Sequence, residues 1–225
     1  MTNCLQTIEQ PLVEVPLSPT IKEAEGGCTD RLRHYFPDLS AGQMAAFGRL
    51  GALYAYWNAR INVISRADIS NLYEHHVLHS LAIAKAVAPV PGTSVLDLGC
   101  GGGFPGIPLA IVWPQVQFTL IDGTRKKIAV AQAVAMALGL TNVECRAQRA
   151  EQLRGETFDL VVTRGVAALP QLIKWARPLA PRLIALKGQP VETVRQAAKI
   201  CVKPISQWFS EPWFQEKVIV DVQWD

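Results

Sequence analysis

Residues 95–106 read VLDLGCGGGFPG, a short apolar run that gives way to a loop with five glycines. Glycine allows a tight turn and a close approach of the backbone to a ligand. A glycine-rich loop between a strand and a helix is a common place for a nucleotide-like ligand to bind. The spacing departs from G-x-G-x-x-G, and no Gly-Lys-[Ser/Thr] follows, which excludes a P-loop. The stretch therefore predicts a ligand-binding loop at the end of a strand.

Two acidic residues narrow the class of ligand. Asp122 ends a second predicted strand, nineteen residues after Gly103, where an acid suits the two hydroxyls of a ribose. A dinucleotide and S-adenosylmethionine both have such a ribose. A dinucleotide also has a pyrophosphate, whereas S-adenosylmethionine has an ammonium group that favours a carboxylate near the first loop. Asp97 lies two residues before the first glycine, Gly99, which favours S-adenosylmethionine.

The rest of the chain alternates strand and helix patterns, which predicts βαβ units and a parallel sheet. We expect strands at 94–98, 117–121, 143–145, 158–163 and 183–186, helices at 126–138, 169–176 and 191–200, and β character at 205–209 and 217–222. Before them, two helical patterns run from Ser40 to Trp57 and from Asp68 to about Pro89. Ser40 and Gln43 have the spacing of a capping box at the start of the first. The predicted divisions are an irregular leader (1–38), an N-terminal helical region (39–91) and a ligand-binding domain (92–225).

Composition sets broader limits. The chain has 225 residues, of which 49% are hydrophobic and 18% charged, and this excludes a disordered or collagen-like protein. No apolar run approaches the ~18 residues of a membrane span. Five scattered cysteines without C-x-x-C fit neither a disulfide framework nor a zinc site. We expect a soluble cytoplasmic protein. Basic segments at 31–66 and 123–154 allow a polyanionic partner.

At this point the chain resembles the bacterial small-subunit ribosomal RNA guanine-N7 methyltransferases, once called glucose-inhibited division protein B. The resemblance covers roughly residues 40–190. Its motifs are WN (57–58), NVIS (62–65), HVLHSL (76–81), DLGCGGGFPGIPL (97–109), FTLID (118–122), KK (126–127), RAE (149–151), FD (158–159), TR (163–164) and LKGQ (186–189). It implies a class I S-adenosylmethionine-dependent methyltransferase: a Rossmann-like, doubly wound sheet with a late antiparallel strand, after a small N-terminal helical region.

The resemblance also implies roles for individual residues. The cofactor site would consist of Asp97, Gly99, Gly101, Phe104, Asp122, Ala150, Glu151 and Arg164. Asp122 would bind the ribose, Ala150 and Glu151 would lie against the adenine, and Arg164 would lie near the reacting centre. The implied reaction is N7-methylation of a guanine in the 530 loop of 16S ribosomal RNA, nucleotide 527 in the usual numbering. The implied partner is 16S ribosomal RNA or the small ribosomal subunit, with the protein acting as a monomer.

This chemistry needs no acid or base from the protein. Guanine N7 carries an unshared lone pair and can attack the sulfonium methyl group directly, so the enzyme mainly aligns the reactants and excludes water. Residues 163–166 read TRGV rather than the N-P-P-Y or D-P-P-Y of amine methylation. Because N7 must stay free, we expect Arg164 to contact a phosphate or the methionine carboxylate. The alternatives are a small-molecule methyltransferase, a non-catalytic RNA-binding assembly protein and, less well matched, an NAD-dependent oxidoreductase.

Basic and aromatic residues are candidates for RNA contact. The candidates for phosphate contact are Arg60, Arg66, Arg125, Lys126, Lys127 and Lys187. Phe104 or Trp57 could stack on the target base, although core packing better explains Trp57 on an amphipathic helix. His75 and His79 have zinc-ligand spacing without a third ligand. For these two histidines we expect packing or hydrogen bonding, and no metal.

Overall fold

The computed structural model describes residues 29–191 and 199–224. Seven strands in these residues form one sheet in the order β3-β2-β1-β4-β5-β7-β6. The strands are β1 (Ser94–Leu98), β2 (Gln117–Ile121), β3 (Val143–Arg146), β4 (Leu160–Arg164), β5 (Arg182–Gly188), β6 (Lys199–Pro204) and β7 (Lys217–Gln223). The neighbours among β1 to β5 pair in parallel. Strand β7 is antiparallel to both β5 and β6. The predicted doubly wound sheet with a late antiparallel strand is confirmed.

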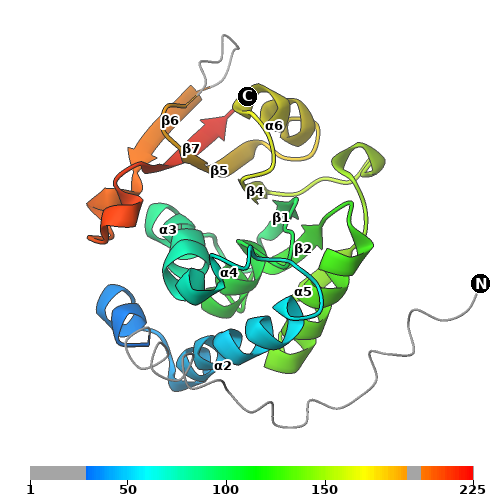
Figure 1. Cartoon of the computed structure of the whole chain (residues 1–225). Coiled ribbons are helices and arrows are strands. Elements are labelled where there is room, and N and C mark those ends of the chain that lie inside the picture. Colours follow the sequence, from blue (N-terminus) through cyan, green and yellow to red (C-terminus); the bar gives the residue numbers. More distant parts are fainter. Residues whose placement is uncertain (1–28, 192–198, 225) are drawn as a thin grey trace, which may run out of the picture.

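Helices cover both faces of the sheet (Figure 1). One face carries α2 (Ala41–Asn58), α3 (His79–Ala86), α4 (Gly106–Val112) and α5 (Arg125–Leu138), and the other carries α6 (Leu169–Ala176). Short 3-10 segments are η1 (Ile69–Asn71), η3 (Ala150–Gln152), η4 (Ile205–Gln207) and η5 (Pro212–Phe214), and η2 (Leu72–Leu78) is a π-helix. Among the described residues, no helix has both the length and the apolar character of a membrane span.

The two faces form two cores because successive side chains of a strand point to opposite sides. In β1, Val95 packs with the helices α2 to α5, whereas Leu96 packs with α6. In β5, Ile184 likewise belongs to the core with α2 to α5, and Ala185 to the core with α6. Strands buried on both faces appear in a sequence as continuous apolar runs. This explains why the strands appear in the sequence as apolar runs without alternating polar and apolar residues.

The N-terminal helical region shares its core with the sheet. Ser40 and Gln43 form the predicted capping box, with Gln43 N donating to Ser40 Oγ at 3.2 Å and Ser40 N donating to Gln43 Oε1 at 2.9 Å. Gln43 Nε2 also donates to the carbonyl oxygens of Ile111 and Val112, which satisfies the open end of α4. One side chain thus starts α2 and joins it to α4.

Three local predictions need correction. The predicted irregular leader contains a helix at 29–35, where Leu32 is fully buried, while residues 1–28 lie outside the described residues. The predicted helix at 191–200 lies largely outside them too, and its last two residues belong to strand β6. Residues 205–207 form a 3-10 turn rather than a strand. At 199–200, pairing with β7 determines the backbone, which local propensity does not register.

Candidate functional site

The glycine loop lies where the sheet changes direction. Strand β1 has β2 on one side and β4 on the other, so the chain leaves β1 in one direction and later returns to the opposite side. In open α/β sheets, ligands bind in the crevice outside the carboxyl ends of the strands at such a switch point. Thr163 Oγ1, from β4, donates to the Leu98 carbonyl oxygen of β1 at 2.7 Å, which joins the two strands at the base of the crevice.

Backbone conformation explains the glycines of the loop. Gly99, Gly101 and Gly103 have φ of 73°, 56° and 113°, a region that other residues rarely adopt. A Cβ atom on Gly99 would lie 2.5 Å from Val166, and one on Gly102 would lie 2.8 Å from Val63. A Cβ on Gly101 would meet no atom within 4 Å. The loop is therefore packed on several sides and has open space above Gly101.

Asp122 joins the glycine loop to the end of β2. Its carboxylate accepts the Gly101 N–H at 3.1 Å and the Thr124 N–H at 2.7 Å. Asp122 is partly exposed. A carboxylate has about four acceptor positions, so two remain for the hydroxyls of a ribose.

Asp97 lies beneath the loop rather than on its surface. It is fully buried, and its Oδ2 accepts the Gly106 N–H at 2.7 Å. Its Oδ1 has no hydrogen-bond partner among the described residues. Burial raises the pKa of Asp97 to about 8, despite the opposing effects of the Gly106 N–H and Arg164. Asp97 therefore holds the two ends of the loop together and keeps one buried oxygen unpaired.

Arg164 and Phe104 meet at the same edge. The Arg164 guanidinium carbon lies 5.2 Å from the centre of the Phe104 ring. Phe104 is only 3% exposed, with Tyr54 at 4.7 Å and His76 at 5.3 Å between ring centres. The expectation that Phe104 stacks on an RNA base is wrong in this structure, because these neighbours enclose its ring. Burial lowers the pKa of Arg164 to about 10, which leaves it charged at neutral pH.

Two residues of this cluster had no role predicted from the sequence. Arg164 Nη2 lies 2.9 Å from Nδ1 of His76, and His76 Nε2 lies 2.7 Å from Oδ2 of Asp68. The HVLHSL motif contains His76, so the sequence marked this residue but did not indicate its partners. Asp68 is 96 residues from Arg164 in the sequence, and only the packing of η2 against the end of β4 brings them together.

The predicted adenine-binding pair follows β3. Ala150 and Glu151 start the 3-10 turn η3, which is stabilised by Arg149 N donating to Gln152 Oε1 at 2.8 Å. Strand β3 neighbours β2 in the sheet, so its carboxyl end reaches the same edge as Asp122. Ala150 is partly buried and Glu151 is exposed.

The family comparison decides the identity. A family model described as GidB, rRNA small subunit methyltransferase G, matches residues 43–206. The Ribosomal RNA small subunit methyltransferase G of Porphyromonas gingivalis is 48% identical over 219 residues, covering 92% of this chain and 97% of that protein. The protein of the same name from Bacteroides thetaiotaomicron is 49% identical, covering 83% and 95%.

This chain belongs to the rRNA small subunit methyltransferase G family. It is therefore an rRNA methyltransferase. A SAM-dependent methyltransferase from Aquifex aeolicus shares the fold, with a TM-score of 0.51, 16% identity and coverage of 71% of this chain and 98% of that one. A mutant of MtNAS in complex with S-adenosylmethionine gives a TM-score of 0.56 at 13% identity, covering 91% and 96%. At these identities the two likenesses concern the fold alone.

The residues at the edge fit the cofactor that a class I rRNA methyltransferase implies, S-adenosylmethionine. The unpaired, buried Asp97 Oδ1 is an acceptor without a donor within the described part of the chain. The open space above Gly101 leaves the backbone of the loop approachable. Partly exposed Asp122 has the acceptors that a ribose needs.

The rRNA-binding candidates of this methyltransferase differ in exposure. Arg66, Arg125 and Lys126 are exposed, and Arg60 is exposed with its guanidinium 3.6 Å above the Tyr56 ring. Lys127 and Lys187 are partly buried. Lys187 Nζ donates to the Ala167 carbonyl oxygen at 3.0 Å, which stabilises the loop after β4.

Trp57 and the two spaced histidines have packing roles in the enzyme. Trp57 packs against the core, as the core interpretation predicts. His75 stacks on Trp213 with 4.1 Å between ring centres, and His79 meets the same indole edge-on at 5.0 Å. No group of three metal-binding side chains occurs among residues 29–191 and 199–224.

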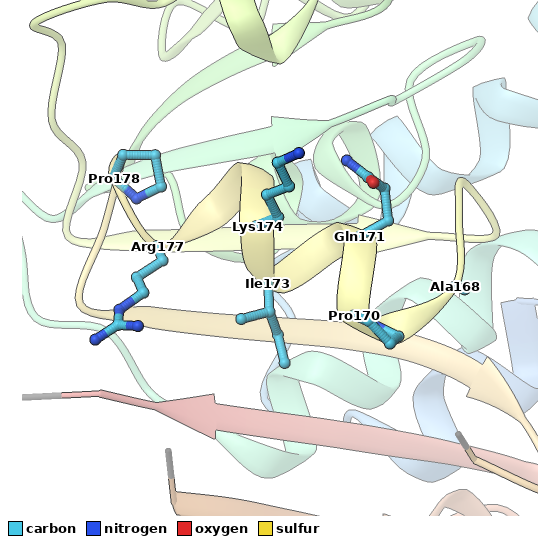
Figure 2. Close-up of a pocket in the computed structure, with 7 residues that line it drawn as sticks. All are labelled: Ala168, Pro170, Gln171, Ile173, Lys174, Arg177 and Pro178. Carbon is cyan, nitrogen blue, oxygen red and sulfur yellow. The ribbon is translucent and has the colours of Figure 1, made fainter. Parts of the chain in front are cut away.

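A pocket of about 660 Å³ lies on α6, apart from the predicted site residues (Figure 2). Its lining residues are Ala168, Pro170, Gln171, Ile173, Lys174, Arg177 and Pro178. In Figure 2, Lys174 and Gln171 extend from one side of the helix and Ile173 from the other. The lining includes none of the residues predicted for cofactor or RNA, so we assign it no part in methyl transfer.

Proposed function

We propose that this methyltransferase uses S-adenosylmethionine to methylate N7 of a guanine in the 530 loop of 16S ribosomal RNA, nucleotide 527 in the usual numbering. The observation that supports it most is the meeting of the glycine loop, Asp122 and Arg164 at one edge of the sheet, in a chain of the rRNA small subunit methyltransferase G family. The relatives are bacterial proteins, and the proposed place of action is the cytoplasm.

Bound S-adenosylmethionine would supply an electrophilic methyl group on sulfur. Asp122 would accept hydrogen bonds from the ribose hydroxyls while it keeps its bonds to Gly101 and Thr124. Ala150 and Glu151 would lie along the adenine. The backbone of Gly99 and Gly101 would line the methionine part. Asp97 would attract the ammonium group from beneath the loop.

Arg164 would then act as a fixed positive charge and not as an acid or a base. Its guanidinium has only N–H donors and stays charged at neutral pH. A contact with guanine O6 and N7 would block the reacting lone pair, so Arg164 would hold a phosphate or the methionine carboxylate. Its fixed place over Phe104 would align cofactor and base, which is the main requirement for attack by a free lone pair.

Cysteine-based methylation of a pyrimidine carbon does not suit this site. Burial raises the pKa of the Cys100 thiol well above its ordinary value. Burial also raises the pKa of Cys145 to about 12. Because the thiolate is the nucleophile, neither residue is activated for attack on a base.

The proposed rRNA surface contains Arg60, Arg66, Arg125 and Lys126, all exposed, with Lys127 and Lys187 partly exposed. Each contact with a phosphate would release counterions and make binding weaken with salt. We propose that the protein works as a monomer on 16S ribosomal RNA or the small subunit.

The test is methyl transfer from labelled S-adenosylmethionine to small subunits from cells that lack the modification, with free 16S ribosomal RNA in parallel. We expect a single N7-methylguanine in the 530 loop, mapped by mass spectrometry, and much slower but still measurable transfer in Arg164→Ala. Transfer to another base would refute the target. Tight S-adenosylhomocysteine binding without transfer to either RNA would instead favour a small-molecule substrate, and RNA binding without any transfer would favour an assembly protein.

A further inference from the structure

A chain of hydrogen bonds runs from Asp68 to the cofactor edge. Asp68 Oδ2 lies 2.7 Å from His76 Nε2, and His76 Nδ1 lies 2.9 Å from Arg164 Nη2. Arg164 Nη1 also donates to the His75 carbonyl oxygen at 3.0 Å. The segment η1–η2 thus holds the last side chain of β4 through two bonds.

The chemistry of the partners determines the protonation of His76. Arginine can only donate, so His76 Nδ1 must accept and cannot carry a proton. The proton of the neutral ring is then on Nε2, where it is donated to the Asp68 carboxylate. Burial lowers the pKa of His76 to about 4, and the nearby Arg164 contributes to this shift, so the ring is neutral at pH 7.

Asp68 is itself held in place. Its Oδ1 lies 2.5 Å from His75 Nδ1 and accepts from Asn71 Nδ2 at 3.2 Å. Burial alone would raise the pKa of Asp68, but hydrogen bonds with His75, His76 and Asn71 outweigh it and lower the pKa below its ordinary value. The π-helix η2 carries both histidines, and single π-helical turns in proteins occur frequently at functional sites.

The arrangement leaves Arg164 able to bind a ligand. A guanidinium has five N–H donors, and the hydrogen bonds to His75 and His76 use one on each terminal nitrogen. Phe104 lies against the guanidinium and is itself packed on Tyr54. An arginine fixed on two sides loses little conformational freedom when it binds an anion.

We propose that Asp68 and His76 are positioning residues: Asp68 fixes His76 as the Nε2–H tautomer, and Nδ1 of that ring holds Arg164 at the cofactor edge. This inference rests on the proposed function for the role of Arg164. The rival explanation is that the three side chains only stabilise the contact between η2 and the sheet.

A double-mutant cycle separates the two explanations. If His76 acts through Arg164, the effect of mutating His76 is small once Arg164 has been removed, so the effects of the two mutations are not additive. We expect His76→Gln to lower single-turnover kcat/KM on small subunits about tenfold in the wild-type background and less than twofold in Arg164→Ala. Asp68→Asn should behave in the same way with a smaller effect. Equal falls in both backgrounds would overturn the proposal.

Two further variants serve as rescue and control. His76→Asn places an amide oxygen near the position of Nδ1, so we expect it to retain activity within about threefold of wild type. Glu74→Gln also removes a negative charge from η2. Glu74 pairs with Arg31 at 2.8 Å, and its other oxygen lies 3.9 Å from His75 Nε2, so the bonds from Asp68 through His76 to Arg164 are kept and activity should not change. A His76→Asn protein as impaired as His76→Gln, with unchanged Tm, would contradict the proposal.

The tautomer can be measured without cofactor or RNA. In ¹⁵N-histidine-labelled protein at pH 7, we expect the NMR shifts of His76 to show a protonated Nε2 and an unprotonated Nδ1. A proton on Nδ1, or on both nitrogens, would refute the chain of bonds. Because this measurement needs no substrate, a wild-type protein that methylates no RNA would count against the proposed function alone.

Discussion

Replacement of Gly101 by alanine tests whether the open space above the loop is the ligand site. Gly101 has φ of 56°, and a Cβ there meets no protein atom within 4 Å. Its backbone N–H donates to the Asp122 carboxylate, and alanine keeps this hydrogen bond. The new methyl group would therefore strain the backbone slightly and otherwise occupy only the space above the loop.

The expected magnitudes separate stability from binding. A non-glycine residue in the left-handed region lowers the free energy of unfolding by about 1–2 kcal/mol. For a domain of this size, each kcal/mol corresponds to about 2–4 °C in Tm. A methyl group forced into a close contact with a ligand makes the binding free energy less favourable by about 1–3 kcal/mol. Every 1.4 kcal/mol is about tenfold in Kd. We expect Gly101→Ala to bind S-adenosylhomocysteine about tenfold more weakly or worse.

Gly139→Ala is the matched control. Gly139 ends α5 with φ of 69°, and a Cβ there also meets nothing within 4 Å, but it lies at the C-terminal end of α5 and not in the loop. Calorimetric titration with S-adenosylhomocysteine and thermal unfolding should show similar losses of Tm in both variants and weaker binding in Gly101→Ala only. Equal affinities in the two variants would refute the assignment of this space to the cofactor.

Three other results are expected. Asp122→Ala should weaken S-adenosylhomocysteine binding about 10- to 100-fold, measured by titration, because a charged acceptor of ribose hydroxyls is lost; unchanged affinity would remove the ribose assignment. Asp97 has a pKa of about 8, and a bound ammonium would lower it, so binding should release a proton and strengthen as pH rises from 6 to 8. Asp97→Asn should abolish that component of the pH dependence, and an unaltered slope would contradict it. Thr163→Val should lower the free energy of unfolding by about 1–3 kcal/mol in denaturant titration, since the buried Leu98 carbonyl loses its donor; a change below a few tenths would show that water replaces the hydroxyl.

Local features were predictable because they depend on neighbours in the sequence. Ser40 and Gln43 showed their capping box by spacing alone. The loop glycines and Asp122 also follow a fixed spacing, since a loop and the next strand end must meet at one edge. The helix predicted at 191–200 was wrong at residues 199 and 200, where pairing with β7 decides the backbone.

The sequence by itself therefore determined the sheet class and, through its motifs, the family, and it predicted a ligand-binding loop and a ribose-binding acid. Only the tertiary structure decided the environment of each side chain. It buried Phe104, placed Asp97 beneath the loop with one unpaired oxygen, and brought Asp68 and His76 to Arg164. The physical reason is that burial and partners depend on contacts between segments far apart in the chain, whereas spacing reports only on residues that are close together.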